Sequence, residues 1–265
     1  MTSALPVTVR AVCATYLALV DAVLPGFVEA LYLHGSLVFG EWHGPSSDVD
    51  FMVVSSRRPT AAELRLLRQV HADLEQVFPA PRYDGCYVTW VDLAAGPDAT
   101  PDVPGILAGD FGDEGRYALC PVTWCEIAWH GVTVRGPVPA EVDVWADLAT
   151  LKRYSHQNMQ DYWAPNVEEL ARFPDEAGNG DVVAWYVLGP PRLHHLLVTG
   201  RLTSKDGAGA HAVAAFGERW RPLVAEALAF RATGELVEAL DHRTRGEQVL
   251  ELARTVVRAS AELTP

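Results

Sequence analysis

The chain has 265 residues, 49% of them hydrophobic, which is enough for one large folded domain or two modest ones with a real core. Its formal net charge of −13 repels nucleic acid phosphates, so a polynucleotide partner is disfavoured and a cationic small-molecule acceptor is favoured. The apolar stretch over residues 11–20 is too short to span a bilayer and lacks signal-peptide features, so we expect a cytoplasmic protein without a membrane partner.

The first half of the chain predicts alternating helices and strands. In order, we expect a helix over residues 6–23, a strand over 28–34, a helical turn from Gly35, a strand over 49–54, a helix over 61–77, and strands over 83–91 and 132–135. Residues 96–115 are rich in Pro, Gly and Asp and are predicted to form a long loop. This pattern predicts an α+β N-terminal domain with a small mixed sheet and flanking helices, over residues 1–140.

After Gly136-Pro137 the strand signals fade and helical ones dominate. We predict an all-α bundle over residues 141–265, with helices near 144–163, 182–198, 208–216, 220–231, 236–240 and 245–262. Pro190 and Pro191 are predicted to kink or split the second of these helices. The four cysteines lack CxxC spacing and predict reduced thiols with no zinc site.

Two acidic residues mark the start of the second strand. Asp48 and Asp50 are two apart, so in a strand they point to the same face. Adjacent carboxylates repel each other unless a cation lies between them, and Mg²⁺ suits a few carboxylates together with phosphate oxygens and water. We therefore predict that Asp48 and Asp50 bind Mg²⁺.

The pair Gly35-Ser36 closes the preceding strand and opens a helical turn. Glycine lets the backbone approach a phosphate, and amides at a helix start together with the Ser36 hydroxyl suit a triphosphate. Ser47 is a further candidate donor. These residues lie within a short stretch, so two adjacent strands can bring them together.

The segments 33–40 (LHGSLVFG) and 47–51 (SDVDF) resemble the nucleotidyltransferase fold of the polymerase β superfamily. That resemblance implies that Ser36 contacts phosphate and that Asp48 and Asp50 are catalytic residues that hold Mg²⁺. Residues 192–206 and 220–231 look like the helical domain of the streptomycin/spectinomycin adenylyltransferases. This implies transfer of AMP from ATP to a hydroxyl of an aminoglycoside or aminocyclitol-like molecule, with Arg192 and Lys205 on the ATP phosphates.

The chemistry gives a second argument that Arg192 and Lys205 bind the phosphates, because nucleotidyl transfer needs positive charge near the departing pyrophosphate. The chain has two lysines, and Lys205 follows a Thr-Gly turn at a helix start. The alternatives are an exposed lysine in a turn capped by Ser204 or Asp206, and a surface ion pair for Arg192.

The acceptor hydroxyl needs a general base, and the resemblance implies a glutamate on the third strand. Tyr87 aligns with that position, and Asp84 is the nearest carboxylate. Asp84 is our candidate base if the strand is shifted or if Gly85 forms a bulge; otherwise Asp84 belongs to a turn.

Asp181 and Trp185 are our candidates for acceptor binding, since an acid pairs with ammonium groups and an aromatic face stacks on a sugar or cation. The alternative is that the aromatics belong to the bundle core. His194, His195 and His211 are predicted to be structural, because adjacent helical histidines diverge by about 100°.

Three functions stay open: an aminoglycoside-type adenylyltransferase, a nucleotidyltransferase with another metabolite or a protein side chain as acceptor, and a nucleotide-binding regulatory protein with weakened catalysis. The third function is considered because no glutamate aligns with the position expected for the general base. We expect a monomer.

Overall fold

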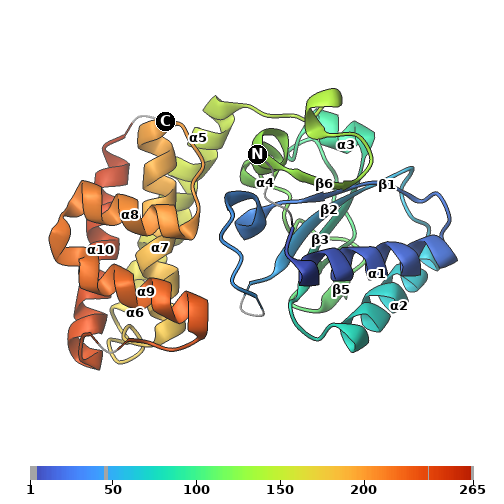
Figure 1. Cartoon of the computed structure of the whole chain (residues 1–265). Coiled ribbons are helices and arrows are strands. Elements are labelled where there is room, and N and C mark those ends of the chain that lie inside the picture. The colour runs from blue at the N-terminus through green and yellow to red at the C-terminus, as the bar shows by residue number, and fades with distance from the viewer. Residues whose placement is uncertain (1–4, 45–46, 238, 264–265) are drawn as a thin grey trace. The chain divides into compact units, whose positions relative to one another are not determined.

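The structure is a computed structural model, and it describes residues 5–44, 47–237 and 239–263. The chain divides into two compact units, Met1–Asp147 and Leu148–Pro265, so the break lies seven residues beyond the predicted position near 140. The first unit contains both helices and strands, and the second consists of helices (Figure 1). The described residues contain no helix with the length and apolarity needed to cross a membrane.

A six-stranded mixed sheet forms the centre of the first unit, in the order β5-β4-β3-β2-β1-β6. The pair β2–β3 is parallel and the other neighbouring pairs are antiparallel. The strands are β1 (Val28–Leu33), β2 (Val49–Ser55), β3 (Tyr83–Thr89), β4 (Gly105–Leu107), β5 (Asp110–Gly112) and β6 (Val132–Arg135). The prediction of a mixed sheet with flanking helices is confirmed.

Strand β2 is buried on both faces, which explains its continuous apolar run. Val49, Phe51 and Val53 belong to a core shared with helices α1 (Val7–Val23) and α2 (Ala61–Val77). Met52 and Val54 belong to a second core, with side chains from helices α3 (Trp90–Ala95) and α4 (Pro121–His130). Because side chains alternate along a strand, Asp50 shares its face with Met52 and Val54.

Two predictions in the first unit are wrong in detail, and further elements were missed. The third strand ends at Thr89, whose side chain accepts a hydrogen bond from the Asp92 amide and starts α3. The predicted loop over residues 96–115 contains the β4–β5 hairpin, whose turn residues Ala108 and Gly109 have φ angles of 55° and 87°. Strands of three residues are too short to show an alternating pattern in sequence. Helix α4 was not predicted either.

The regular elements described in the second unit are helices. They are α5 (Leu148–Asn158), a π-helical turn (Met159–Trp163), α6 (Ala164–Leu170), α7 (Gly180–Thr199), α8 (Lys205–Phe216), α9 (Arg221–Thr233) and α10 (His242–Ala261), with a 3₁₀ turn at Glu218–Trp220. Of the predicted kink or split, the split does not occur: α7 continues through Pro190 and Pro191, which are both buried. Tertiary packing therefore outweighs the lost backbone hydrogen bonds.

The region predicted as a helix over residues 236–240 is not helical at its described residues, which exclude 238. Glu226 of α9 explains why: its Oε1 accepts the Leu240 amide at 2.7 Å, and its Oε2 accepts from Arg245 Nε of α10 at 2.5 Å. Arg245 also donates to the carbonyl oxygens of Gly178 and Leu240. This buried ion pair fixes the α9–α10 connection by side-chain bonds that sequence periodicity does not reveal.

Candidate functional site

The glycine-serine corner lies directly against one of the predicted metal-binding acids. Gly35 follows β1, has a φ of +66°, and opens a 3₁₀ turn over Gly35–Phe39. A Cβ added to Gly35 would lie 2.0 Å from Asp50 Oδ2, so the Asp50 carboxylate packs onto the glycine backbone. Glycine is therefore needed here for two reasons, its left-handed backbone and the space for Asp50.

Asp50 has a second acidic neighbour on the adjacent strand. In the parallel pair β2–β3, Asp50 and Asp84 are direct register partners, and the register continues unbroken from Val49 and Tyr83 to Ser55 and Thr89. Asp48, just before β2, is exposed. Burial raises the pKa of Asp50; His34 partly opposes this rise, and Glu126, Asp48 and Asp84 add to it.

Asp84 is a buried strand residue in an unbroken register, so neither the bulge at Gly85 nor the turn that we considered is present. Its Oδ2 accepts the amide of Ala108 at 3.0 Å, at the β4–β5 turn, whereas its Oδ1 is buried with no hydrogen-bond partner among the described residues. Burial raises the pKa of Asp84, the Ala108 hydrogen bond lowers it, and Asp48 raises it. Gly85 instead allows close packing, because a Cβ there would lie 2.0 Å from the Phe51 carbonyl oxygen.

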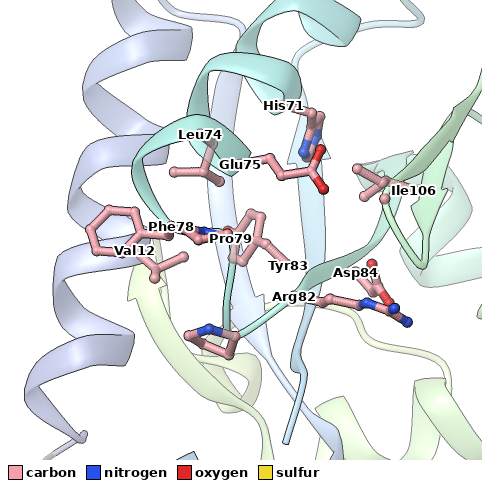
Figure 2. Close-up of a pocket in the computed structure, with 12 residues that line it drawn as sticks. Val12, His71, Leu74, Glu75, Phe78, Pro79, Arg82, Tyr83, Asp84 and Ile106 are labelled. Carbon is pink, nitrogen blue, oxygen red and sulfur yellow. The ribbon is translucent and has the colours of Figure 1, made fainter. Parts of the chain in front are cut away.

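A small pocket lies beside Asp84, between α1, α2 and β3 (Figure 2). Tyr83 and His71 line it together with Glu75, Arg82 and Asp84. Tyr87, which we aligned with the expected glutamate, is four residues from Tyr83 on β3 and belongs to the α1–α2 core. Its hydroxyl contacts Tyr16 Oη at 2.9 Å and His71 Nε2 at 2.7 Å. Tyr87 therefore points away from the acids, and Asp84 is the carboxylate beside Asp50.

Three residues near the acids were missed as site candidates. Glu126 of α4 accepts the Gly35 amide at 3.1 Å, and its Oε2 lies 3.4 Å from His34 Nδ1. Burial lowers the pKa of His34, but the hydrogen bond to Glu126 and the charge of Asp50 raise it overall. Burial raises the pKa of Tyr117, and the charges of Asp50, Asp84 and Asp48 add to that rise, so this phenol lies close to the acids.

The predicted phosphate donors differ in what they already bind. The Gly35 amide donates to Glu126 in this structure, and the role of Gly35 in phosphate binding stays a prediction. Ser47 is buried, and its Oγ accepts the His43 amide at 2.9 Å, which closes the preceding loop. Ser36 is half-buried, and within the described residues no group binds its hydroxyl or its amide. Ser36 is therefore the donor that remains for a ligand.

The acids at the corner fit a hydrated divalent cation. No three His, Cys, Asp or Glu side chains converge on a ready-made metal cage within residues 5–44, 47–237 and 239–263. Mg²⁺ needs no such cage, since it is bound by one or two carboxylates together with water and substrate phosphates. The raised pKa of Asp50 and the unpartnered Asp84 Oδ1 are features that a cation would relieve.

In the second unit, Arg192, Lys205 and Trp185 line one pocket of about 310 Å³ with Asn158, Tyr162, Trp163, Gly189 and Leu193. Lys205 Nζ lies 5.8 Å from the centre of the Trp185 ring, and Arg192 Nε donates to the Thr203 carbonyl at 2.8 Å. The lysine also sits in a capped turn, because Ser204 Oγ accepts the Gly207 amide at 2.9 Å. Lys205 therefore both follows a capping serine at the start of α8 and lines the pocket.

The remaining candidates of the second unit lie outside that pocket. Asp181 is exposed in the first turn of α7, where a carboxylate also stabilises the helix dipole, and it does not line the pocket. His194 Nδ1 and His211 Nε2 are 2.8 Å apart, and His195 Nδ1 lies 3.1 Å from the Arg201 carbonyl oxygen. Burial, followed by the charges of His194 and His195, lowers the pKa of His211 to about 4.

The fold of the chain has a likeness among solved structures. It is similar to the crystal structure of spectinomycin adenyltransferase AAD(9) from Enterococcus faecialis with ATP and spectinomycin, with a TM-score of 0.64. The likeness covers 92% of this chain and 98% of that one, at 12% sequence identity, so it shows the fold. No family model matches the sequence, and no curated protein matches it.

Proposed function

We propose that the protein is a Mg²⁺-dependent nucleotidyltransferase that moves AMP from ATP to a hydroxyl of a small cationic acceptor of the aminoglycoside or aminocyclitol type. The observation that carries the proposal is the meeting of three acids with a glycine-serine corner on a nucleotidyltransferase-like fold. Asp50 packs on Gly35 and pairs in register with Asp84, while Asp48 is close enough to raise the pKa of both.

Each residue has a chemical task in this proposal. Asp48 and Asp50 would hold Mg²⁺, which supplies positive charge to the phosphate oxygens. The Ser36 hydroxyl and amide would donate to a phosphate. Asp84 would accept the proton of the acceptor hydroxyl as that oxygen forms its bond to the α-phosphorus, while the bond between the α-phosphorus and the pyrophosphate oxygen breaks.

Two features of Asp84 suit a general base. Its raised pKa increases its affinity for a proton, and the Ala108 amide fixes Oδ2 while Oδ1 has no protein partner among the described residues. We further propose that Arg192 and Lys205 bind the polyphosphate and that the Trp185 ring and the acidic Asp181 contribute to acceptor recognition.

The test is pyrophosphate release by purified protein with ATP, Mg²⁺ and a panel that contains streptomycin and spectinomycin. Release is expected with at least one acceptor, and Asp50→Ala should abolish it. Asp98→Ala, which removes an exposed carboxylate elsewhere in the first unit, is the matched control and should behave like wild type. ATP binding without release on these drugs would contradict the acceptor class, and release by Asp50→Ala would contradict the site.

A further inference from the structure

Glu126 is a buried carboxylate that the three-acid chemistry does not use. Its side chain is 4% exposed, and it comes from the middle of α4, which is 91 residues away from Gly35 in sequence. An unpartnered carboxylate in this environment is costly, and Glu126 Oε2 makes two contacts to the segment that carries the corner: the Gly35 amide at 3.1 Å and His34 Nδ1 at 3.4 Å.

These contacts hold the backbone where the turn begins. The His34 amide donates to the Asp50 carbonyl oxygen at 3.0 Å, which ties the end of β1 to β2. The His34 ring and the Gly35 amide then both bind one oxygen of Glu126, so α4 fixes the direction in which the chain leaves β1. Ser36 is the next residue along the chain, and its position depends on that direction.

Electrostatics argue against a purely stabilising role for Glu126. Its charge raises the pKa of Asp50, so it adds repulsion to a site that already contains three aspartates. His34 offsets part of this repulsion, because Glu126 and Asp50 together raise the pKa of its ring despite its burial and so favour its positively charged form. Buried ion pairs can often be replaced by apolar side chains without loss of stability, so the position of the hydrogen bonds is the more important property here.

We propose that Glu126 is a positioning residue: through the Gly35 amide and the His34 ring it holds Ser36 in the orientation that binds a nucleotide phosphate. The inference rests on the proposed function and deepens it. It also explains why the Gly35 amide is directed at a side chain, since that amide anchors the corner while Ser36 faces the ligand.

The experiment compares two side chains of equal length in the full chain. Glu126→Gln keeps a carbonyl oxygen that accepts from Gly35, whereas Glu126→Met removes the acceptor and fills similar volume. The dissociation constant of MgATP is measured by calorimetry for both, and kcat and KM for ATP are measured with an active acceptor. We expect the Gln variant to stay within about threefold of wild type and the Met variant to bind MgATP about tenfold or more weakly, because a buried amide is left unpaired.

Two controls separate positioning from general damage. Asp92→Ala removes another buried carboxylate of the first unit, one that accepts the Thr89 amide at 2.7 Å, and should leave the MgATP dissociation constant unchanged. In a Ser36→Ala background, Glu126→Met should cost much less than in wild type, because the two changes act on the same contact. A merely structural glutamate would give additive effects.

The outcomes are distinguishable. Wild-type protein that fails to bind MgATP overturns the proposed function and this inference with it. Binding that Ser36→Ala weakens but Glu126→Met leaves intact overturns the inference alone. If the Met variant does not fold, the Gln variant decides: a folded Glu126→Gln protein with a tenfold loss of MgATP affinity contradicts a role that depends on the acceptor oxygen.

Discussion

Gly35→Ala changes the corner by a single methyl group and leaves every charge in place. The new Cβ would lie 2.0 Å from Asp50 Oδ2 and 2.8 Å from its Cγ. Since real Cβ contacts below 3.0 Å essentially do not occur, the carboxylate must move by about 1 Å. The left-handed backbone at φ +66° adds a second cost for any residue with a Cβ.

These two costs have different sizes and different consequences. The left-handed conformation costs about 1–2 kcal/mol for alanine, and steric overpacking adds about 1–3 kcal/mol. The total of about 2–5 kcal/mol lowers the free energy of unfolding. A displacement of about 1 Å at a reacting group can cost about 100-fold in rate, so we expect a loss of this order in pyrophosphate release.

Gly26→Ala is the matched control for the backbone term. Gly26 has a φ of +74°, but nothing lies within 4 Å of an added Cβ. It should lose about 1–2 kcal/mol of stability in urea unfolding and keep full activity and MgATP affinity. If Gly35→Ala, in its folded state, matches Gly26→Ala in both activity and MgATP binding, Asp50 does not depend on the corner and the reasoning fails.

Three further predictions follow from the described contacts. Asp84→Asn should lower kcat by about 10²–10⁴-fold while the MgATP dissociation constant stays within about threefold, and an unchanged kcat would rule out a base at this position. Between pH 6.5 and 4 the unfolded chain binds a proton that folded His211 does not, so the free energy of unfolding should fall by about 1–2 kcal/mol from pH 7 to 5, the lower figure allowing for solvent screening; urea unfolding of His211→Phe should show a smaller fall, and an equal one would contradict the pKa. Glu226→Ala should cost about 3–5 kcal/mol by leaving Arg245 buried without its partner, whereas Glu226→Leu with Arg245→Leu should recover most of that loss in the same assay.

The sequence predicted those parts of the fold in which neighbours along the chain determine the structure. Helix α2 and strands β1 and β2 were predicted within a residue, because their apolar patterns are long and their ends carry caps or turns. The pairing of Gly35 with Asp50 was also predictable, since both lie at the ends of adjacent strands.

Contacts between distant segments were not predictable in this way. Asp84 lies beside Asp50 because of the β2–β3 register, whereas the sequence offered Asp84 only as the carboxylate nearest to Tyr87, which aligned with the expected glutamate. Glu126 reaches Gly35 from a helix whose buried residues include Trp124 and Ile127 and show no clear amphipathic stripe. The β4–β5 turn that binds Asp84 is built from three-residue strands that gain their order by pairing with β3.

The parallel pairing of β2 with β3 has a consequence for attempts to redesign this protein. Neighbouring strands are held about 4.8 Å apart by their backbone ladder, so the separation between the two chains that carry Asp50 and Asp84 is a dimension of the sheet itself. Sliding one strand by a single residue would invert its whole side-chain pattern and expose the core. New substrate preferences should therefore be sought by changing the loops and side chains around this pair, with its spacing kept constant.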